Sequence, residues 1–454
     1  MTPLRLFDDR QFYKNLLVLA IPIILQSFAN TLVGALATVM IGRIGTLEVA
    51  AVGLGNQLFF LFDLCLFGIG SGGAIFTAQF WGRKDISGIR KNMGFCLTLG
   101  LTAAFIFTMI SVLFPGGFIG LYSRDKDVIK AGAAYIRSIS PSFIPYSISV
   151  VFIMTLRSVE KVRLGFIATV IFLVLNTVLN YIFIFGAGPV PCMGIEGAGR
   201  ATSIARLVQA VILVMTAYIR RYTPAGSFRE LTAFNAYYAG QFFRFTVPVM
   251  ANEILWALGV TVHNVIFART STDAIAAYNI TTTVWNLVWV FVSGIGNAVG
   301  ILVGKKIGEN DEAKAREYAA RSVYFTPLLS IGTALVLFFL SRMLPFIFNV
   351  NPVTTLYASQ MLAILCCVFP FRAFNNTMII GICRAGGDTV FSAIYDVSIM
   401  WIFSIPLAVL AAFAFGAPVW VIYLCLASEY LLKTILGFWR FKSGKWLHNV
   451  TTGL

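Results

Sequence analysis

Charged side chains are scarce in this 454-residue chain, making up 12% of the sequence, against roughly 25% in soluble domains. Histidine occurs only as His263 and His448, and the seven cysteines show neither a CxxC pair nor a Cys/His spacing. Structural zinc sites require such ligands. Cys192 is the one cysteine expected in an outward loop. The sequence therefore argues against a zinc site and against a disulfide between outward loops.

Signatures of catalysis and nucleotide binding are also missing. The chain has no GxxxxGK[ST] and no GxSxG segment, so it offers neither a phosphate-binding loop nor a serine nucleophile. We find no cluster of His, Asp and Glu deep in an apolar segment. The sequence therefore argues against ATP-driven activity within this chain. A polytopic membrane enzyme, such as a lipid-modifying transferase, is disfavoured.

Apolar residues dominate what is present, at 58% of the sequence. About 20 consecutive apolar residues span a bilayer as a helix. Twelve segments of that kind occur, at about 16–41, 50–78, 93–115, 134–156, 163–186, 196–219, 243–267, 277–303, 322–346, 359–382, 391–414 and 418–440. The first is too long for the apolar region of a signal peptide. We predict an all-α integral membrane protein with twelve transmembrane helices.

The second half of the chain repeats the first with a constant difference in residue number. Pro22 aligns with Pro248, and Gly82 aligns with Gly308, without a gap between. Same-sense repeats in a long membrane chain predict two lobes around a substrate path. We therefore expect two pseudo-symmetric six-helix lobes. The N-lobe is expected at 1–219, a cytoplasmic linker at 220–242, and the C-lobe at 243–454.

Basic residues are distributed unevenly among the expected loops. Alternate loops hold 23 Lys and Arg, whereas the opposite loops hold six. Under the positive-inside rule, both termini and the 220–242 linker are cytoplasmic. The net charge of +15 therefore reflects the orientation of the chain in the membrane and does not indicate nucleic-acid binding. We predict a multi-pass cell-membrane protein that is a monomer, with the lipid bilayer and small-molecule substrates as partners and no nucleic acid.

Several motifs resemble one family of membrane proteins when taken in their order along both copies. They are AIPIILQ, MIGRIGTLEVAAVGLGNQ, GIGSGGAIFTAQFWGRKD, NTVLNYIFIFGAG, GIEGAGRATSIAR, VPVMANEILWALG and GICRAGGDT. The chain resembles the multidrug and toxic compound extrusion family of cation-coupled exporters, within the superfamily that includes lipid-linked oligosaccharide flippases. The resemblance covers nearly the whole chain. It implies a two-lobed exporter that alternates between inward and outward openings.

The chain departs from this family at one important position. The resemblance implies an aspartate in the first helix a few residues before Ile41-Gly42-Arg43, where this chain has Ala37. The fifth-helix position that is acidic in some archaeal members is Asn180. We therefore expect that coupling does not use an aspartate pair in the N-lobe: either a different site serves, or the chain carries a substitution at Ala37.

Acidic residues inside membrane spans require an explanation, since Asp at a helix centre costs about 2.5–3.5 kcal/mol on insertion scales. Only Asp63, Glu253 and Glu429 lie deep in an expected span, with Asp396 near a cytoplasmic end. Two arginines match their depths. Arg206 would pair with Asp63, and Arg372 would join Glu253 and Glu429 in a C-lobe cluster. Glu429 also has Lys433 one helical turn away.

Glu253 is the leading candidate for coupling to a cation. The family resemblance links an acidic position in the seventh helix to this role. We expect Glu253 to alternate between Arg372 and the coupling ion, because a group with different partners in two states gives the differential affinity that coupling requires. Neutralising ion pairs that lock helices together are the alternative, favoured for Asp63 and Glu429. Asp388 is a weaker candidate because it lies in an expected cytoplasmic turn, Arg384 to Asp388.

Further polar and aromatic residues are candidates for lining a central cleft. His263, at the repeat position of Ala37, is either a hydrogen-bonded interior residue or a proton-sensitive group. Aromatic faces attract cations, but the pattern is weakly specific, and ordinary membrane packing accounts for most such rings. The candidates are Gln26, Asn30, Phe59, Phe62, Asn176, Asn180, Asn252, Trp256, His263, Tyr278, Trp285 and Trp289.

Together these features favour a secondary antiporter that exports amphipathic, often cationic drugs or toxic metabolites. H⁺ or Na⁺ would be the coupling ion, with no cofactor and no metal beyond a bound Na⁺. A lipid-linked sugar or lipid flippase of the same superfamily is the alternative. It would be expected to have a strongly cationic cavity, whereas the deep arginines here match acids in depth.

Overall fold

A computed structural model of the protein describes residues 8–341 and 350–454. Twelve helices in this part of the chain are long and apolar enough to cross a membrane. Each overlaps one of the segments predicted from the sequence over most of its length, which confirms the all-α membrane fold. Residues 342–346, the end of the ninth predicted span, lie outside the described residues. Contacts divide the chain into two compact units, and each is described by itself.

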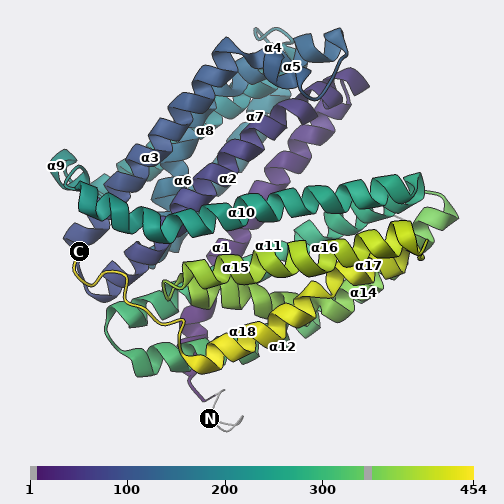
Figure 1. The fold of residues 1–454 in the computed structure, drawn as a ribbon. Helices are drawn as coiled ribbons and strands as arrows, with labels where there is room; N and C mark the ends of the chain where they lie inside the picture. Colours follow the sequence, from purple (N-terminus) through teal and green to yellow (C-terminus); the bar gives the residue numbers. More distant parts are fainter. Residues whose placement is uncertain (1–7, 342–349) are drawn as a thin grey trace. The chain divides into compact units, whose positions relative to one another are not determined.

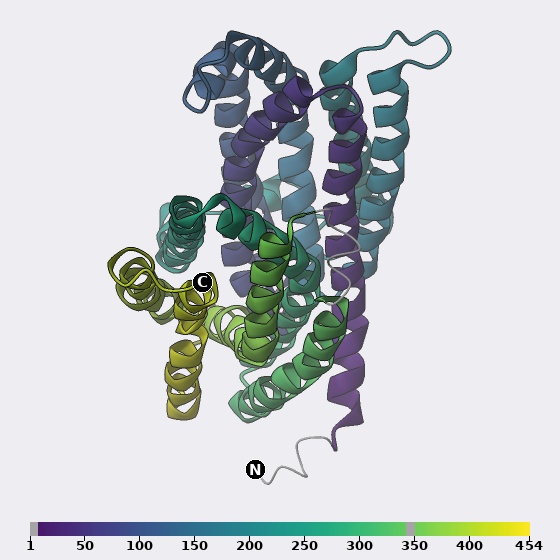
Figure 2. The same ribbon diagram turned by 90° about the vertical axis from the view of Figure 1, so that its right-hand side faces the viewer.

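The N-terminal unit comprises residues 25–246, with Leu454. Its helices α2, α3, α6 and α8 run side by side (Figures 1 and 2), and α7 packs along α8. Its elements are α1 (Arg10–Gly42, from residue 25), α2 (Thr46–Gly82), α3 (Ile86–Leu113), α4 (Pro115–Gly120), α5 (Lys126–Ile139), η2 (Ser140–Ser142), α6 (Phe143–Ser158), α7 (Val162–Phe185), α8 (Gly194–Ile219), α9 (Phe228–Leu231) and the start of α10 (Ala236–Thr270).

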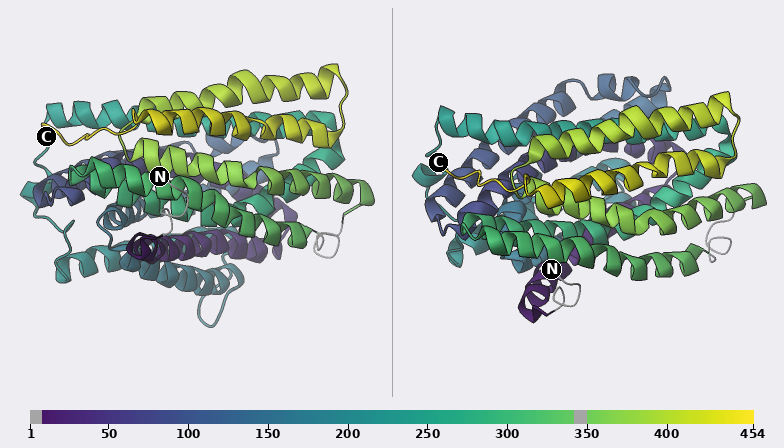
Figure 3. Two further views of the ribbon diagram at one scale, coloured as in Figure 1. Left: turned by 90° about the horizontal axis from the view of Figure 1, so that it is seen from below. Right: turned by 60° about the horizontal axis from the view of Figure 1, so that its bottom comes forward.

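The C-terminal unit comprises the described residues of 1–24 and 247–453. Figure 3 shows its long helices lying side by side, with α14 packed against α11 and α12. Its further elements are α11 (Thr272–Gly308), α12 (Glu312–Ser341), α14 (Pro352–Asn376), the π-helical η3 (Thr377–Arg384), α15 (Thr389–Ser398), η4 (Ile399–Ser404), α16 (Ile405–Val409), η5 (Leu410–Ala414), α17 (Val419–Ala427) and α18 (Glu429–Ser443).

The repeat is visible in the helix boundaries. Helices α2 and α11 are both 37 residues long, and their first and last residues are repeat equivalents in the predicted register. The turns that follow match as well: Lys84 and Asn310 have φ values of 59° and 57°. Asp85 then accepts a hydrogen bond from Gly88 N at 2.8 Å, and Asp311 accepts one from Lys314 N at 3.1 Å. The two copies therefore share their helix caps.

The predicted constant register is wrong for the later part of the repeat. The next pair of positive-φ turns is at Glu160 (φ 62°) and Gly387 (φ 75°), whereas the register of Pro22 and Pro248 would align Glu160 with Gly386. Helices α7 and α15 begin at Val162 and Thr389, with the same shift by one position. Between the two registers lies the π-helical η3. A π-helical turn accommodates one extra residue within a helix, which explains the change of register.

The segment expected to link the two halves, 220–242, contains α9 and the first residues of α10. Helix α9 packs against α3, and Arg90 forms an ion pair with Glu230. Close packing is possible because Gly94 has no side chain: a Cβ there would lie 1.8 Å from the carbonyl oxygen of Leu231. This part of the segment is thus anchored to the N-terminal unit.

Candidate functional site

The C-terminal unit contains an ion pair between Glu253 in α10 and Arg384 at the end of η3. Arg384 Nη2 lies 2.6 Å from Glu253 Oε1, and the two side chains are 4% and 16% exposed, respectively. The sequence-based pairing of Glu253 with Arg372 is therefore wrong for this structure. It failed because the π-helical segment carries Arg384 into the bundle as part of a helix, whereas the sequence suggested a turn.

Asn252 extends this pair toward a second carboxylate. Its Oδ1 accepts a hydrogen bond from Arg384 at 3.0 Å, and its Nδ2 donates to Asp396 Oδ2 at 3.1 Å. Asn252 itself is buried. An amide can accept and donate at once, so it joins two charged groups without adding a charge.

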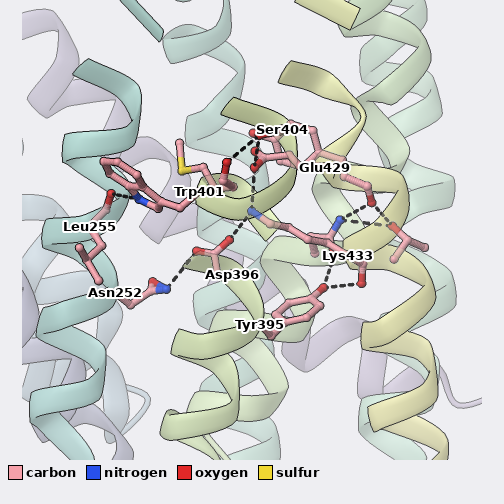
Figure 4. Close-up of polar contacts among 12 residues, drawn as sticks. Asn252, Leu255, Tyr395, Asp396, Trp401, Ser404, Glu429 and Lys433 are labelled. Atoms are coloured by element: carbon pink, nitrogen blue, oxygen red, sulfur yellow. Dashed lines mark hydrogen bonds and ion pairs between the residues drawn. The ribbon is translucent and has the colours of Figure 1, made fainter. Parts of the chain in front are cut away.

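Lys433 of α18 bridges two carboxylates (Figure 4). Its Nζ lies 2.6 Å from Asp396 Oδ1 and 3.2 Å from Glu429 Oε2. The predicted pair between Glu429 and Lys433 is confirmed, and both side chains are only 2% exposed. Ser404 of η4 donates to Glu429 at 3.5 Å. Buried charges require such partners, because their desolvation is costly.

We call the connected set Glu253, Arg384, Asn252, Asp396, Lys433 and Glu429 the charge network. Neighbouring groups hold it in place: the Tyr395 hydroxyl lies against Asn375 Oδ1 and 2.6 Å from the Lys433 carbonyl oxygen. Trp401 Nε1 donates to the carbonyl oxygen of Leu255 at 3.1 Å (Figure 4). The network therefore joins α10, η3, α15 and α18 through side chains.

Glu429 also lines a cavity within the C-terminal unit. Arg372 lies in its wall, with its guanidinium 3.5 Å from the Trp285 ring centre and 4.4 Å from that of Tyr430. The volume open to water is about 50 Å³, which is enough for a few water molecules. The lining consists of His263, Tyr278, Thr281, Thr282, Trp285, Arg372, Tyr423, Leu426, Ala427, Glu429 and Tyr430.

His263 is 8% exposed, and its Nε2 has no hydrogen-bond partner among the described residues. A buried ring nitrogen without a partner is costly unless water reaches it. The cavity provides room for that water. His263 thus marks a polar, hydratable space next to Glu429.

The predicted pairing of Asp63 with Arg206 in the N-terminal unit is indirect. Tyr146 donates a hydrogen bond to Asp63. Arg206 stacks over the rings of Tyr146, at 4.3 Å, and Phe172, at 3.8 Å. Among the described residues, no direct ion pair joins Asp63 to Arg206. Tyr146 thus contacts the Asp63 carboxylate through its hydroxyl and the Arg206 guanidinium through the face of its ring.

A series of hydrogen bonds between mostly neutral side chains extends from Arg206 through the N-terminal unit. Arg206 donates to Gln209 at 2.9 Å, and Gln209 donates to Thr169 at 3.3 Å. Gln26 donates to Thr169 at 2.9 Å and accepts from Arg157 at 2.6 Å. The predicted residue Gln26 is therefore part of a buried polar chain that is mostly uncharged.

Other predicted residues take separate positions. Asn180 donates to Asn176, which donates to Thr202. Asn30 and Trp256 occupy equivalent positions in the repeat, and both are exposed. Asp388 accepts hydrogen bonds from Arg440 at 2.7 and 2.9 Å, so it ties α18 to the turn before α15.

The predicted aromatic residues pack within their own units. Phe62 is fully buried and contacts Phe59. Tyr278 stacks on Phe267 at 4.6 Å, and Trp285 contacts Trp289 at 5.2 Å. A central cleft lined by these rings remains a prediction.

Sequence reasoning missed several members of both sets. It places Arg384 in a loop and Lys433 in a simple helical pair, and it gives Arg157, Tyr146 and Gln209 no role. One signal was available. Arg157 and Arg384 both lie just after an expected span in equivalent parts of the two halves, so comparing the halves would have marked both positions.

The fold and the buried charges define a multi-pass helical transport protein built from two related bundles. Residues 22–182 and 248–410 match the MatE family model. The chain belongs to the MatE family, whose members are transporters and not enzymes.

Relatives and solved structures agree with this assignment over nearly the full length. The chain is 22% identical to the uncharacterized transporter YisQ of Bacillus subtilis, covering 98% of this chain and 97% of YisQ. It is 24% identical to the probable multidrug resistance protein NorM of Thermotoga maritima, covering 95% and 93%. The Vibrio cholerae MATE transporter VcmN in its bent form has the same fold, with a TM-score of 0.87, 16% identity and coverage of 96% and 99%.

Proposed function

We propose that this protein is a secondary exporter of amphipathic, often cationic small molecules, driven by exchange for H⁺ or Na⁺. The relatives from Thermotoga maritima and Photorhabdus laumondii carry the name multidrug resistance protein. The observation that carries the proposal is the charge network, because buried ionisable groups in membrane spans mark ion pathways. No cofactor is needed for this exchange.

Glu253 is the proposed coupling group. It holds Arg384 at 2.6 Å, and a cation that binds Glu253 would weaken this pair. Arg384 would then keep its hydrogen bond to Asn252, at 3.0 Å, without the ion pair. Binding of the ion would therefore change how η3 is held against α10, and a ligand shifts two states only through such a difference in affinity.

The topology follows from the charge distribution. We propose that both termini and residues 220–242 face the cytoplasm in the plasma membrane, because the basic residues lie mostly on that side. The protein would act as a monomer, with its substrate path between two six-helix lobes that open alternately.

Purified protein in liposomes provides the test. Glu253→Gln keeps the shape of the side chain and removes its charge. The variant should bind ethidium, a lipophilic cation, but fail to accumulate it under an imposed pH or Na⁺ gradient. Glu196→Gln is the matched control, because Glu196 forms an exposed pair with Arg200. Wild-type accumulation by a folded Glu253→Gln protein would refute the coupling role.

A further inference from the structure

Lys433 occupies the position between two carboxylates of the charge network. Its ammonium lies between Asp396 Oδ1, at 2.6 Å, and Glu429 Oε2, at 3.2 Å. Hard metal cations are held by several oxygen atoms that converge on one point. Here the point between the two carboxylates is filled by a covalently attached cation. Lys433 is 2% exposed, so it cannot simply swing into solvent.

The charges around this point are already balanced. Glu253, Asp396 and Glu429 provide three carboxylates in the C-terminal unit, and Arg384 and Lys433 neutralise two of them. Arg372 provides a third positive charge in the wall of the cavity that Glu429 also lines. A Na⁺ ion would therefore find neither an excess negative charge nor an empty set of ligands.

The three carboxylates differ in their surroundings: the side chains of Glu253 and Asp396 are 16% and 13% exposed, whereas Glu429 is 2% exposed and meets a cavity instead. Glu429 lines the hydratable cavity, together with His263 and its unpartnered Nε2. Asp396 and Glu253 are not among the residues lining this cavity. Water in the cavity can deliver a proton to Glu429 without displacing any side chain, since proton transfer needs only hydrogen-bond contact.

Building on the proposed function, we infer that Lys433 acts as a tethered cation that makes the protein proton-coupled, with Glu429, alongside Glu253 of the same charge network, as a carboxylate that exchanges the proton. A hydronium ion in the cavity gives its proton to a Glu429 oxygen and becomes water. Lys433 then loses one carboxylate partner and keeps the other, Asp396. The reverse transfer returns the proton to water and restores the bridge.

The groups that face Glu429 set the conditions for this exchange. They come from six elements: His263 on α10, Tyr278 on α11, Arg372 on α14, Asp396 on α15, Tyr423 on α17, and Tyr430 and Lys433 on α18. Arg372 and Lys433 are the two basic side chains in this set. Protonation of Glu429 would leave Lys433 held by Asp396 alone, which links the proton to the packing of α18 against α15.

The first experiment measures ethidium accumulation by the wild-type protein in liposomes, under a pH gradient and separately under a Na⁺ gradient of equal size. Accumulation with the pH gradient alone is expected. Accumulation driven by Na⁺ alone would overturn the inference and leave the proposed exporter intact. No accumulation with either gradient would overturn both.

The second experiment measures thermal unfolding in NaCl and in choline chloride at equal concentration. Lys433→Gln leaves two buried carboxylates without their ammonium, so Na⁺ should raise its unfolding temperature. The wild type and the exposed control Lys442→Gln should unfold at the same temperature in both salts. A wild type stabilised by Na⁺ as strongly as Lys433→Gln would overturn the inference.

A third variant covers the case in which Lys433→Gln does not fold. Glu429→Gln mimics the protonated carboxylate and leaves Lys433 paired with Asp396. It should bind ethidium with an affinity that no longer changes with pH, while wild-type affinity changes. An unchanged pH dependence in Glu429→Gln would overturn the role of this carboxylate.

Discussion

The two units place basic side chains at equivalent positions but surround them differently. In the register observed after the π-helical segment, Arg157 is equivalent to Arg384, and Arg206 to Lys433. Each unit has its own apolar groove, and the two grooves support the same register: Leu207 and Val211 line one, and their equivalents Thr434 and Phe438 line the other. The bases therefore belong to the shared framework of the repeat.

The acids do not. In the same registers, the three carboxylates of the C-terminal unit correspond to hydroxyl residues in the N-terminal unit: Glu253 to Ser27, Asp396 to Thr169, and Glu429 to Thr202. In the N-terminal unit, Arg157 donates a hydrogen bond to the amide oxygen of Gln26, and Arg206 stacks on the ring of Phe172. Acids inside a membrane are costly, so their concentration in one unit supports the coupling role proposed for Glu253.

The largest effect is expected from removing the equivalent arginines. Arg384→Met removes the ion-pair partner of the partly buried Glu253 carboxylate, and breaking a buried pair costs about 3–5 kcal/mol. Arg157→Met leaves only the Gln26 amide oxygen unpaired, at about 1–3 kcal/mol. Thermal unfolding in detergent should therefore show the larger loss for Arg384→Met. Equal losses would remove the energetic distinction between the two units.

A smaller effect is expected where one unit has glycine and the other alanine. Gly94→Ala would force α9 away from α3, since the new Cβ would lie 1.8 Å from the Leu231 carbonyl oxygen; overpacking costs about 1–3 kcal/mol. The equivalent residue of the other unit is Ala320, and Ala320→Gly should cost only about 1 kcal/mol from helix propensity. Faster proteolysis at α9 in Gly94→Ala alone would support the difference.

The smallest effect concerns the matched caps. The backbone N–H of Lys314 holds the pKa of Asp311 below its ordinary value. Because the folded pKa is depressed, the stabilisation is present above the unfolded pKa and disappears as pH falls through the folded pKa. Asp311→Asn should therefore unfold at a slightly lower temperature than wild type at neutral pH. The difference should vanish in acid; a difference that persists there would show that charge is not its cause.

The sequence predicted the fold well because membrane spans and same-sense repeats leave strong signals in hydropathy and spacing. It also identified Glu253, Glu429, Asp396 and Asp63, since acids are rare in apolar helices. Their partners were harder to predict. Matching depth suggested Arg372 for Glu253, but one extra residue in η3 places Arg384 there instead.

Aromatic faces were the second source of error. Depth alone cannot distinguish a carboxylate from a ring as the partner of an arginine. Arg372 lies on Trp285 and Tyr430, and Arg206 lies on Tyr146 and Phe172. In both cases the guanidinium is satisfied by cation–π contact, which leaves no spacing pattern in the sequence.

The most direct test of the central claim compares Glu253→Gln with Asp63→Asn in liposomes. Both changes remove one membrane carboxylate, the first from the C-terminal unit and the second from the N-terminal unit. Accumulation of ethidium is measured under the gradient that drives the wild type. The account predicts that Asp63→Asn still accumulates ethidium and that Glu253→Gln does not. Accumulation by a folded Glu253→Gln protein, with its loss in a folded Asp63→Asn protein, would contradict it.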